Sequence, residues 1–173
     1  VVALAAEIQQ LLSLEEVLAA VEPDTLLLVL DGVTDPRNLG ACLRVADAAG
    51  VSAVVVPRDR SAGMSPAATK AAAGAAESVA LIEVTNLARA LEAIADAGVR
   101  TVGAAGEAES SLFELDLRGP TAWVLGAEGG GLRQLTRKTC DEAARIPIGG
   151  SVESLNVSVS AAICLYETAR QRG

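Results

Sequence analysis

Residues 25–50, TLLLVLDGVTDPRNLGACLRVADAAG, predict a buried strand that leads directly into a capped helix. The run TLLLVLDGV (25–33) is continuously apolar, which is typical of a strand buried on both faces of a sheet. Asp35 followed by Pro36 is the signature of a helix N-cap with proline in the first turn, and Gly50 ends the helix. A buried strand joined to a helix in this way is the building unit of an α/β protein.

The rest of the chain repeats this alternation of strand and helix. Five further strands are expected at SAVVVP (52–57), VALIEV (79–84), RTVGAA (100–105), TAWVLG (121–126) and RIPI (145–148). Helices are expected to begin at Ser65-Pro66, at Asn86 and near Asn156, and the last one to end near Arg170. We therefore predict an α/β domain with a mostly parallel sheet and helices on both faces.

The composition fits one cytoplasmic domain. The 173 residues are 51% hydrophobic but only 2% aromatic, so small side chains fill the core. Residues 3–20 read as a helix or a linker. No apolar stretch reaches the ~18 residues that span a bilayer, and no signal peptide is visible, so no membrane partner is expected. Cys42, Cys140 and Cys164 show no paired spacing, which favours reduced thiols in a cytoplasmic protein.

Two bulk features limit the possible chemistry. The chain has no His, which excludes zinc sites built on His, Ser-His-Asp triads and His general bases. Its net charge of -8 argues against nucleic-acid binding on its face. Basic clusters nevertheless occur locally, at Arg58 and Arg60 and again at Arg133, Arg137 and Lys138.

Ligands of parallel sheets bind outside the carboxyl ends of the strands, so the loops that follow strands are the candidate sites. The first of these loops, residues 30–44, carries Asp31, Asp35, Arg37, Asn38 and Arg44. Helix capping by Asp35 together with a solvated charged face is the simpler interpretation. Asn38 and Arg44 are six positions apart, or about 120° around a helix. A shared site would require Asn38 to act from the helix entrance, or a second chain.

The second candidate loop lies in WVLGAEGGGLR (123–133), which has four glycines within six residues. Such a loop exposes backbone N–H groups and lets a ligand approach closely. It is not a P-loop, and it comes too late in the chain for a dinucleotide fingerprint. A tight left-handed turn would explain one or two of the glycines but not four. Glu128 in this loop would need a basic partner such as Arg44 if it were buried in a cleft.

The third candidate is IPIGGSVESLNVSVSAA (146–162), where an apolar run stops at Gly149-Gly150 and resumes as a helix. Ser151, Glu153, Ser154 and Asn156 lie in between. N-capping of the last helix by Ser154 is the simpler interpretation. It leaves Asn156 and the glycine pair unexplained.

Together the three stretches resemble the three motifs of the SPOUT superfamily, and more narrowly the SpoU/TrmH-type RNA ribose 2′-O-methyltransferases. The matching pieces, in order, are DGVTDPRNLGACLRVADAAG (31–50), LGAEGGGLR (125–133) and IPIGGSVESLNVSVSAAICLYE (146–167). The segment GAAESVALIEVTNLARAL (74–91) is similar to the subgroup that methylates a guanosine of 23S ribosomal RNA. The resemblance covers nearly the whole chain from Leu26.

The resemblance implies a C-terminal trefoil knot (the SPOUT α/β-knot), S-adenosylmethionine as methyl donor, no metal and a homodimer. Residues 1–24 would be the tail of a missing N-terminal domain with its linker, and residues 25–173 the SPOUT catalytic domain. The implied catalytic residues are Asn38, Arg44, Glu128, Ser154 and Asn156. The implied cofactor-binding residues are Leu125, Gly126, Gly129, Ile146, Ile148 and Leu155. Leu155 would line the adenosyl pocket while Ser154 and Asn156 face the reacting ribose.

The implied reaction is methyl transfer to the ribose 2′-OH of a nucleotide in structured RNA, with a 23S rRNA guanosine as the expected target. A tRNA ribose methyltransferase and a non-catalytic RNA- or nucleotide-binding module on the same fold are the alternatives. A Rossmann-type dehydrogenase is disfavoured because the early glycine fingerprint is missing.

The resemblance assigns Arg44 as the base, yet arginine stays protonated in proteins, so Arg44 could instead stabilise the developing alkoxide. Glu128 could then orient Arg44 or accept the proton. On the last helix, Val159, Ile163 and Tyr166 recur at helical spacing. This stripe is expected to form the dimer seam, and the alternative is that it faces its own sheet.

Overall fold

The computed structural model describes residues 12–127 and 131–173, and these form a six-stranded sheet. The strands lie in the order β3-β2-β1-β5-β4-β6, and every neighbouring pair is parallel. Their bounds are β1 Leu26–Asp31, β2 Ala53–Pro57, β3 Ala80–Val84, β4 Arg100–Ala104, β5 Thr121–Gly126 and β6 Glu142–Ala144. The predicted α/β class with a mostly parallel sheet is confirmed.

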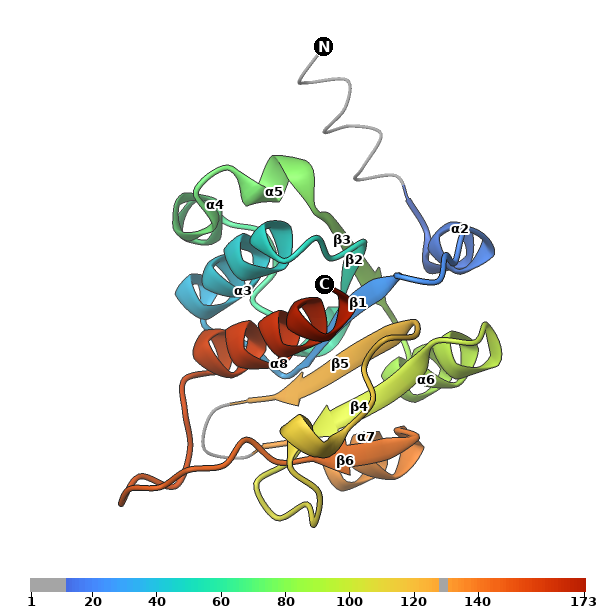
Figure 1. Cartoon of the computed structure of the whole chain (residues 1–173). Coiled ribbons are helices and arrows are strands. Elements are labelled where there is room, and N and C mark those ends of the chain that lie inside the picture. The colour runs from blue at the N-terminus through green and yellow to red at the C-terminus, as the bar shows by residue number, and fades with distance from the viewer. Residues whose placement is uncertain (1–11, 128–130) are drawn as a thin grey trace.

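Helices cover both faces of this sheet, as predicted (Figure 1). One face carries α3, α4, α5 and α8, and the other carries α2, α6 and α7. Their bounds are α2 Leu14–Ala19, α3 Pro36–Ala48, α4 Pro66–Ala72, α5 Ala75–Ser78, α6 Leu87–Asp96, α7 Gln134–Thr139 and α8 Val157–Arg172. Two short 3₁₀ turns, η1 Arg58–Arg60 and η2 Leu112–Glu114, lie in the loops.

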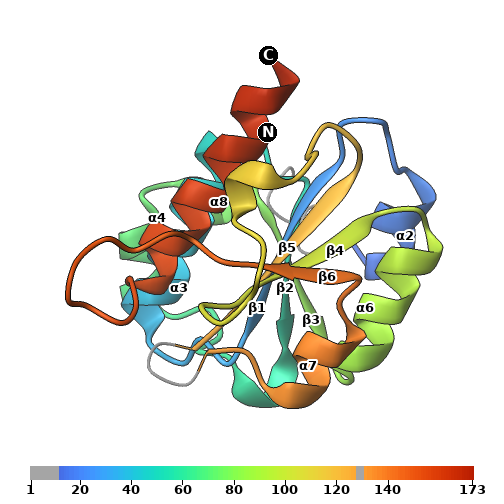
Figure 2. The same cartoon turned by 60° about the horizontal axis from the view of Figure 1, so that its bottom comes forward.

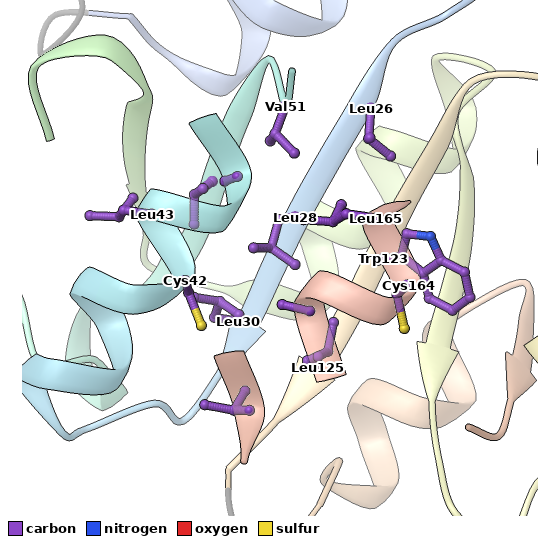
Figure 3. Close-up of a cluster of buried hydrophobic side chains, with 14 of the residues drawn as sticks. Leu26, Leu28, Leu30, Cys42, Leu43, Val51, Trp123, Leu125, Cys164 and Leu165 are labelled. Atoms are coloured by element: carbon purple, nitrogen blue, oxygen red, sulfur yellow. The ribbon is translucent and has the colours of Figure 1, made fainter. Parts of the chain in front are cut away.

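The central strand β1 is buried along its whole length, which is what its apolar sequence predicts. Successive side chains of a strand point to opposite faces, so one continuous apolar run serves two cores. Leu28 and Leu30 pack on the side of α3 and α8 (Figure 3), whereas Leu27 and Val29 belong to the core on the side of α6. The strand can therefore lie only in the middle of the sheet.

The predicted helix ends are confirmed where a local signal marks them. Asp35 accepts a hydrogen bond from the Arg37 N–H at 2.8 Å and so caps α3. Ser65 and Asn86 cap α4 and α6 in the same way. Gly50 and Gly98 follow α3 and α6 with positive φ values of 76° and 88°, a conformation that glycine adopts without strain.

The prediction of a strand over residues 145–148 is wrong. The sixth strand is Glu142–Ala144, and it ends before Arg145. The Arg145 N–H donates to the Ser110 carbonyl at 2.9 Å, in an isolated bridge outside the sheet. Pro147 has no N–H to continue a ladder, and two glycines follow closely. The apolar residues 146 and 148 therefore belong to a loop and not to a strand.

Residues 3–20, predicted to be a helix or a linker, lie partly outside the described residues. Of residues 3–20, the structure describes α2 from Leu14, capped by Ser13. In the part of the chain from residue 12 onward that is described, no helix has the length and hydropathy needed to cross a membrane. All three cysteines are buried as thiols. Burial, with a smaller contribution from Asp141, raises the pKa of the Cys140 thiol to about 12.

Candidate active site

A cavity of about 370 Å³ opens at the carboxyl edge of the sheet, the edge that comes forward in Figure 2. Small-molecule sites commonly measure roughly 300–1,000 Å³, so its size suits a nucleoside-sized ligand. Three segments form its wall, namely the chain after β4, the end of β5 with the chain beyond it, and the segment that leads into α8. The lining residues are Ala104, Ala105, Gly106, Glu107, Leu125, Gly126, Ala127, Gly131, Ile146, Ile148, Glu153, Ser154, Leu155, Val157 and Ser160.

Five of the six residues expected to bind a cofactor line this one cavity. They are Leu125, Gly126, Ile146, Ile148 and Leu155. The sixth, Gly129, lies outside the described residues, as does Glu128. The structure thus brings residues of the second and third motifs, which are separate in sequence, to a single wall. Their role as cofactor ligands stays a prediction.

Two of the four glycines in the segment 126–131 have a structural reason to be there, one steric and one conformational. A Cβ atom on Gly126 would lie 2.1 Å from the Gly131 carbonyl oxygen, which no real side chain tolerates. Gly131 has a φ of +60°, and its N–H donates to the Ala127 carbonyl at 2.9 Å. The two ends of the loop therefore touch through their backbones, and the cavity wall there consists of main chain.

Asn38 and Asn156 meet within one chain, although 118 positions separate them. The Asn156 Nδ2 donates to the Asn38 Oδ1 at 3.1 Å. Asn38 lies in the first turn of α3, so it acts from the helix entrance, which is one of the two arrangements that the helical spacing leaves open. The structure thus joins a residue of the first motif to one of the third.

Asn156 also caps α8, so the interpretation of Ser154 as the N-cap is wrong. The Asn156 Oδ1 accepts from the Ser158 N–H at 2.9 Å and from the Ser158 hydroxyl at 2.5 Å. Ser154 instead lines the cavity. The side-chain amide of Asn156 therefore has two roles. Its oxygen caps the N-terminus of α8, and its nitrogen donates a hydrogen bond to Asn38.

Arg44 is not brought to the cavity by its own chain. It is exposed on α3, and no hydrogen bond or ion pair joins it to any residue of the described ranges 12–127 and 131–173. The expected partner Glu128 lies outside those ranges. The structure of a single chain therefore leaves the role of Arg44 as a prediction.

The basic clusters expected from the sequence are largely paired with carboxylates. Arg58 pairs with Glu83, Arg137 with Glu107, and both Arg60 and Arg133 with Asp31. Sequence reasoning missed this role of Asp31, whose side chain is 0% exposed. The available signal was a charged residue at the end of an otherwise apolar strand. Among the residues that the structure describes, no cluster of acidic or sulfur ligands could hold a metal ion.

The fold, the cavity and the motif residues together define the class. Residues 25–166 match the model of the SpoU rRNA Methylase family, and the chain belongs to that family. Over 99% of its length, the chain is 57% identical to the 23S rRNA (guanosine-2'-O-)-methyltransferase RlmB of Ralstonia nicotianae, and it spans 69% of that relative. Over 85% of its length, it is 62% identical to the RlmB of Yersinia pestis, of which it spans 60%.

A solved structure shares the fold. The SpoU methyltransferase AviRb from Streptomyces viridochromogenes, in complex with the cofactor AdoMet, superimposes with a TM-score of 0.80 at 31% identity. The match covers 88% of this chain and 59% of that one. The chain thus spans about three fifths to two thirds of the longer proteins that it matches.

The two functions of Asn156 can be separated by substitution. Asp also caps helices well, so Asn156→Asp should keep the free energy of unfolding within about 0.5 kcal/mol of wild type. It has no amide N–H to donate to Asn38, so we expect methyl transfer to RNA to fall by about 100-fold. Asn156→Ala should lose the same activity and about 1 kcal/mol of stability as well. Urea unfolding and a methyl-transfer assay measure the two effects, and full activity in Asn156→Asp would show that only the cap matters.

Proposed function

We propose that residues 25–173 form the catalytic domain of an S-adenosylmethionine-dependent RNA methyltransferase. In this proposal the protein methylates the ribose 2′-OH of a guanosine in 23S rRNA. The observation that carries the proposal is the cavity at the carboxyl edge, whose wall combines residues of the second and third motifs beside the Asn38–Asn156 pair. Residues 1–24 would link this domain to an N-terminal one. With ribosomal RNA as the substrate, we place the enzyme in the cytoplasm.

The cavity has the chemistry that S-adenosylmethionine requires. Leu125, Ile146 and Leu155 offer an apolar wall for an adenine ring, and the main chain near Gly126 lets a ligand approach closely. Glu153 also lines the cavity, and a carboxylate attracts a sulfonium cation. When bound, S-adenosylmethionine supplies an electrophilic methyl group, and no metal is needed.

The residues of this chain would then act mainly by positioning the acceptor. The hydrogen-bonded side-chain amides of Asn38 and Asn156, at the N-terminal ends of α3 and α8, are suited to orient a ribose hydroxyl. Alignment of the reacting groups supplies a large part of the rate enhancement in reactions of this kind. Ser154 lines the adjoining cavity and would face the same ribose. We assign Arg44 to the developing alkoxide and a nearby phosphate. Glu128 would orient Arg44 or accept the proton.

We infer a homodimer from the surface of α8. Val159 is 46% exposed and Tyr166 is 51% exposed, so the stripe on this helix does not simply face its own sheet. Of the three stripe residues, Ile163 packs against the core of its own chain. The exposed apolar residues lie on the helix that also packs against α3, and α3 carries Arg44. A partner seated on α8 would bring a second copy of Arg44 toward the Asn38–Asn156 pair.

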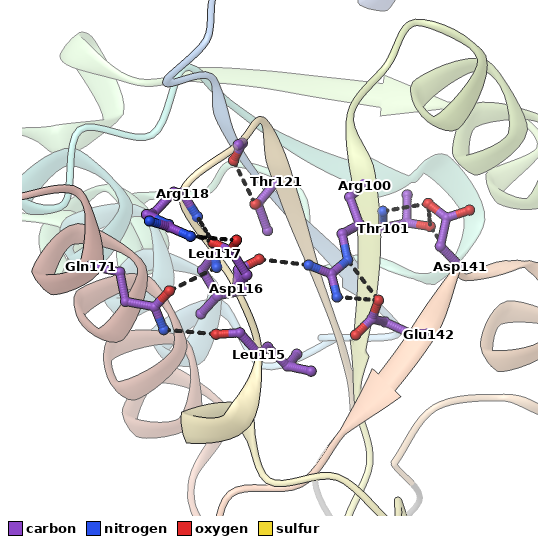
Figure 4. A network of polar contacts seen from close by, with 11 residues as sticks. Arg100, Thr101, Leu115, Asp116, Leu117, Arg118, Thr121, Asp141, Glu142 and Gln171 are labelled. Carbon is purple, nitrogen blue, oxygen red and sulfur yellow. Dashed lines mark hydrogen bonds and ion pairs between the residues drawn. The ribbon is translucent and has the colours of Figure 1, made fainter.

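We also infer the C-terminal knot. Residues 105–120, which connect β4 to β5, contact the chain both before α8 and near the end of α8. Ser110 and Leu112 bond to Arg145 before α8, and Leu115 and Leu117 bond to Gln171 near its end (Figure 4). These contacts support a path in which the chain from Arg145 onward passes through that loop. An experimental structure with a continuous trace tests this, and an unthreaded path would contradict it.

The proposed activity is tested with radiolabelled S-adenosylmethionine and 23S rRNA transcribed without modifications. We expect label to enter one guanosine of the rRNA as its 2′-O-methyl derivative, because the RlmB relatives are named for that acceptor. The control acceptor is unmodified tRNA. Transfer to tRNA alone would support the alternative, and the absence of transfer with intact, folded protein would support a non-catalytic module.

The proposed dimer is tested by mixing two inactive variants. If Arg44 acts at the partner's site, Arg44→Ala and Asn156→Ala should each be nearly inactive alone. A heterodimer of the two would contain one complete site, so the mixture should regain about a quarter of the wild-type rate after random subunit exchange. Subunit exchange is confirmed by native mass spectrometry. Exchange without any recovery would mean that each site is built within one chain.

A further inference from the structure

A buried carboxylate lies at the end of the central strand, just behind the cavity wall. Asp31 is the last residue of β1, and its side chain is fully buried. An ionised carboxylate in such a place costs free energy unless it is paired and hydrogen-bonded. Three donors satisfy it. Arg60 Nη2 lies 2.5 Å from Oδ1, Arg133 Nε lies 3.1 Å from Oδ2, and the Thr136 hydroxyl lies 2.5 Å from Oδ2.

Two of these donors lie just after residues 126–131, the glycine-rich loop. Arg133 is the residue at the start of α7, and Thr136 lies in its first turn. Among the described residues no side chain caps α7. The contacts of Arg133 and Thr136 to Asp31 therefore hold the first turn of this helix in place. Gly131, which lines the cavity, lies only two residues before Arg133.

Asp31 is also adjacent to the other end of the same loop. It is the register partner of Gly126 in the β1–β5 ladder. Gly126 in turn touches Gly131 through its backbone, and Ala127 accepts the Gly131 N–H. Asp31 is thus joined to Gly126 through its main chain and to Arg133, near Gly131, through its carboxylate.

We propose that Asp31 is a positioning residue for methyl-donor binding, which acts by holding Arg133 and so keeping Gly131 against Gly126 at the spacing that shapes the cavity wall. This inference rests on the proposed function. Asp31 does not line the cavity itself, and glycine at residue 131 leaves the backbone free to adopt other conformations. The ion pair removes that freedom before the ligand arrives, which lowers the cost of binding.

The alternative is that Asp31 only stabilises the fold, and Arg60 provides the matched control. Arg60 pairs with the same carboxylate but comes from η1, which does not line the cavity. Arg133→Ala and Arg60→Ala therefore each remove one ion pair from Asp31. Only the first removes a contact next to Gly131 in the cavity wall. Both leave Asp31 with one arginine and Thr136, so both variants should fold.

The first test is calorimetric titration of the full-length protein with S-adenosylmethionine. Arg133→Ala should raise the Kd by about tenfold, which corresponds to about 1.4 kcal/mol, whereas Arg60→Ala should change it by less than about twofold. At saturating methyl donor the kcat of Arg133→Ala should stay within a factor of about three of wild type, because the acceptor residues are untouched. Equal effects of the two substitutions on the Kd would overturn the proposal.

The second test does not depend on the ligand. The amide proton of Gly131 should exchange with solvent faster in Arg133→Ala than in wild type, and not faster in Arg60→Ala. Exchange that is unchanged in Arg133→Ala would overturn the positioning role. If the wild-type protein failed to bind S-adenosylmethionine, the proposed function would fail, while this exchange experiment would still decide whether Arg133 holds Gly131 in place.

Discussion

The docking of α8 against β5 and α3 is the contact on which the site depends. Trp123 of β5 is fully buried, and its indole N–H donates to the Thr168 hydroxyl of α8 at 2.8 Å. The preceding strand, β6, lies at the far edge of the sheet beyond β4. The chain must therefore cross the carboxyl edge to bring α8 back beside α3. This crossing places residues 146–156 over the ends of β4 and β5, where they form the third wall of the cavity.

Some of the ion pairs stabilise the sheet far from the cavity, and others lie close to it. Arg100 pairs with Glu142, and Asp141 accepts from the Thr101 N–H at 2.8 Å, so the β4–β6 edge is fastened away from the cavity (Figure 4). Near the cavity, Asp31 pairs with two arginines that belong to the basic clusters seen in the sequence, so one carboxylate partly compensates two positive charges. Together with the net charge of -8, this pairing would weaken the attraction of these clusters for a polyanion such as RNA.

Much of the fold can be predicted because it is encoded locally. The strand at 121–126 has the bounds that its sequence predicts, and Asp35, Ser65 and Asn86 mark real helix starts. Local patterns fail where a distant contact decides between local options. Both Ser154 and Asn156 can cap a helix, and Asn156 is the residue that also reaches Asn38.

The same limit applies to the site. That Leu125 and Leu155 share a wall is implied by resemblance to a family and not by their spacing, because a crossover of some 30 residues separates them. The partners of Asp31 lie 29, 102 and 105 positions away, so no local pattern could reveal them. A charged residue ending an apolar strand was the only sign that such partners were needed.

The central claim is that one cavity at the carboxyl edge binds the methyl donor through the second and third motifs. Backbone amide chemical shifts recorded during titration with S-adenosylhomocysteine test it most directly. We expect saturable shifts at Leu125, Gly126 and Leu155, and none at Thr101 or Thr121 near the opposite ends of the strands. Saturable shifts confined to that opposite edge, or no shifts at all in a folded protein, would contradict the claim.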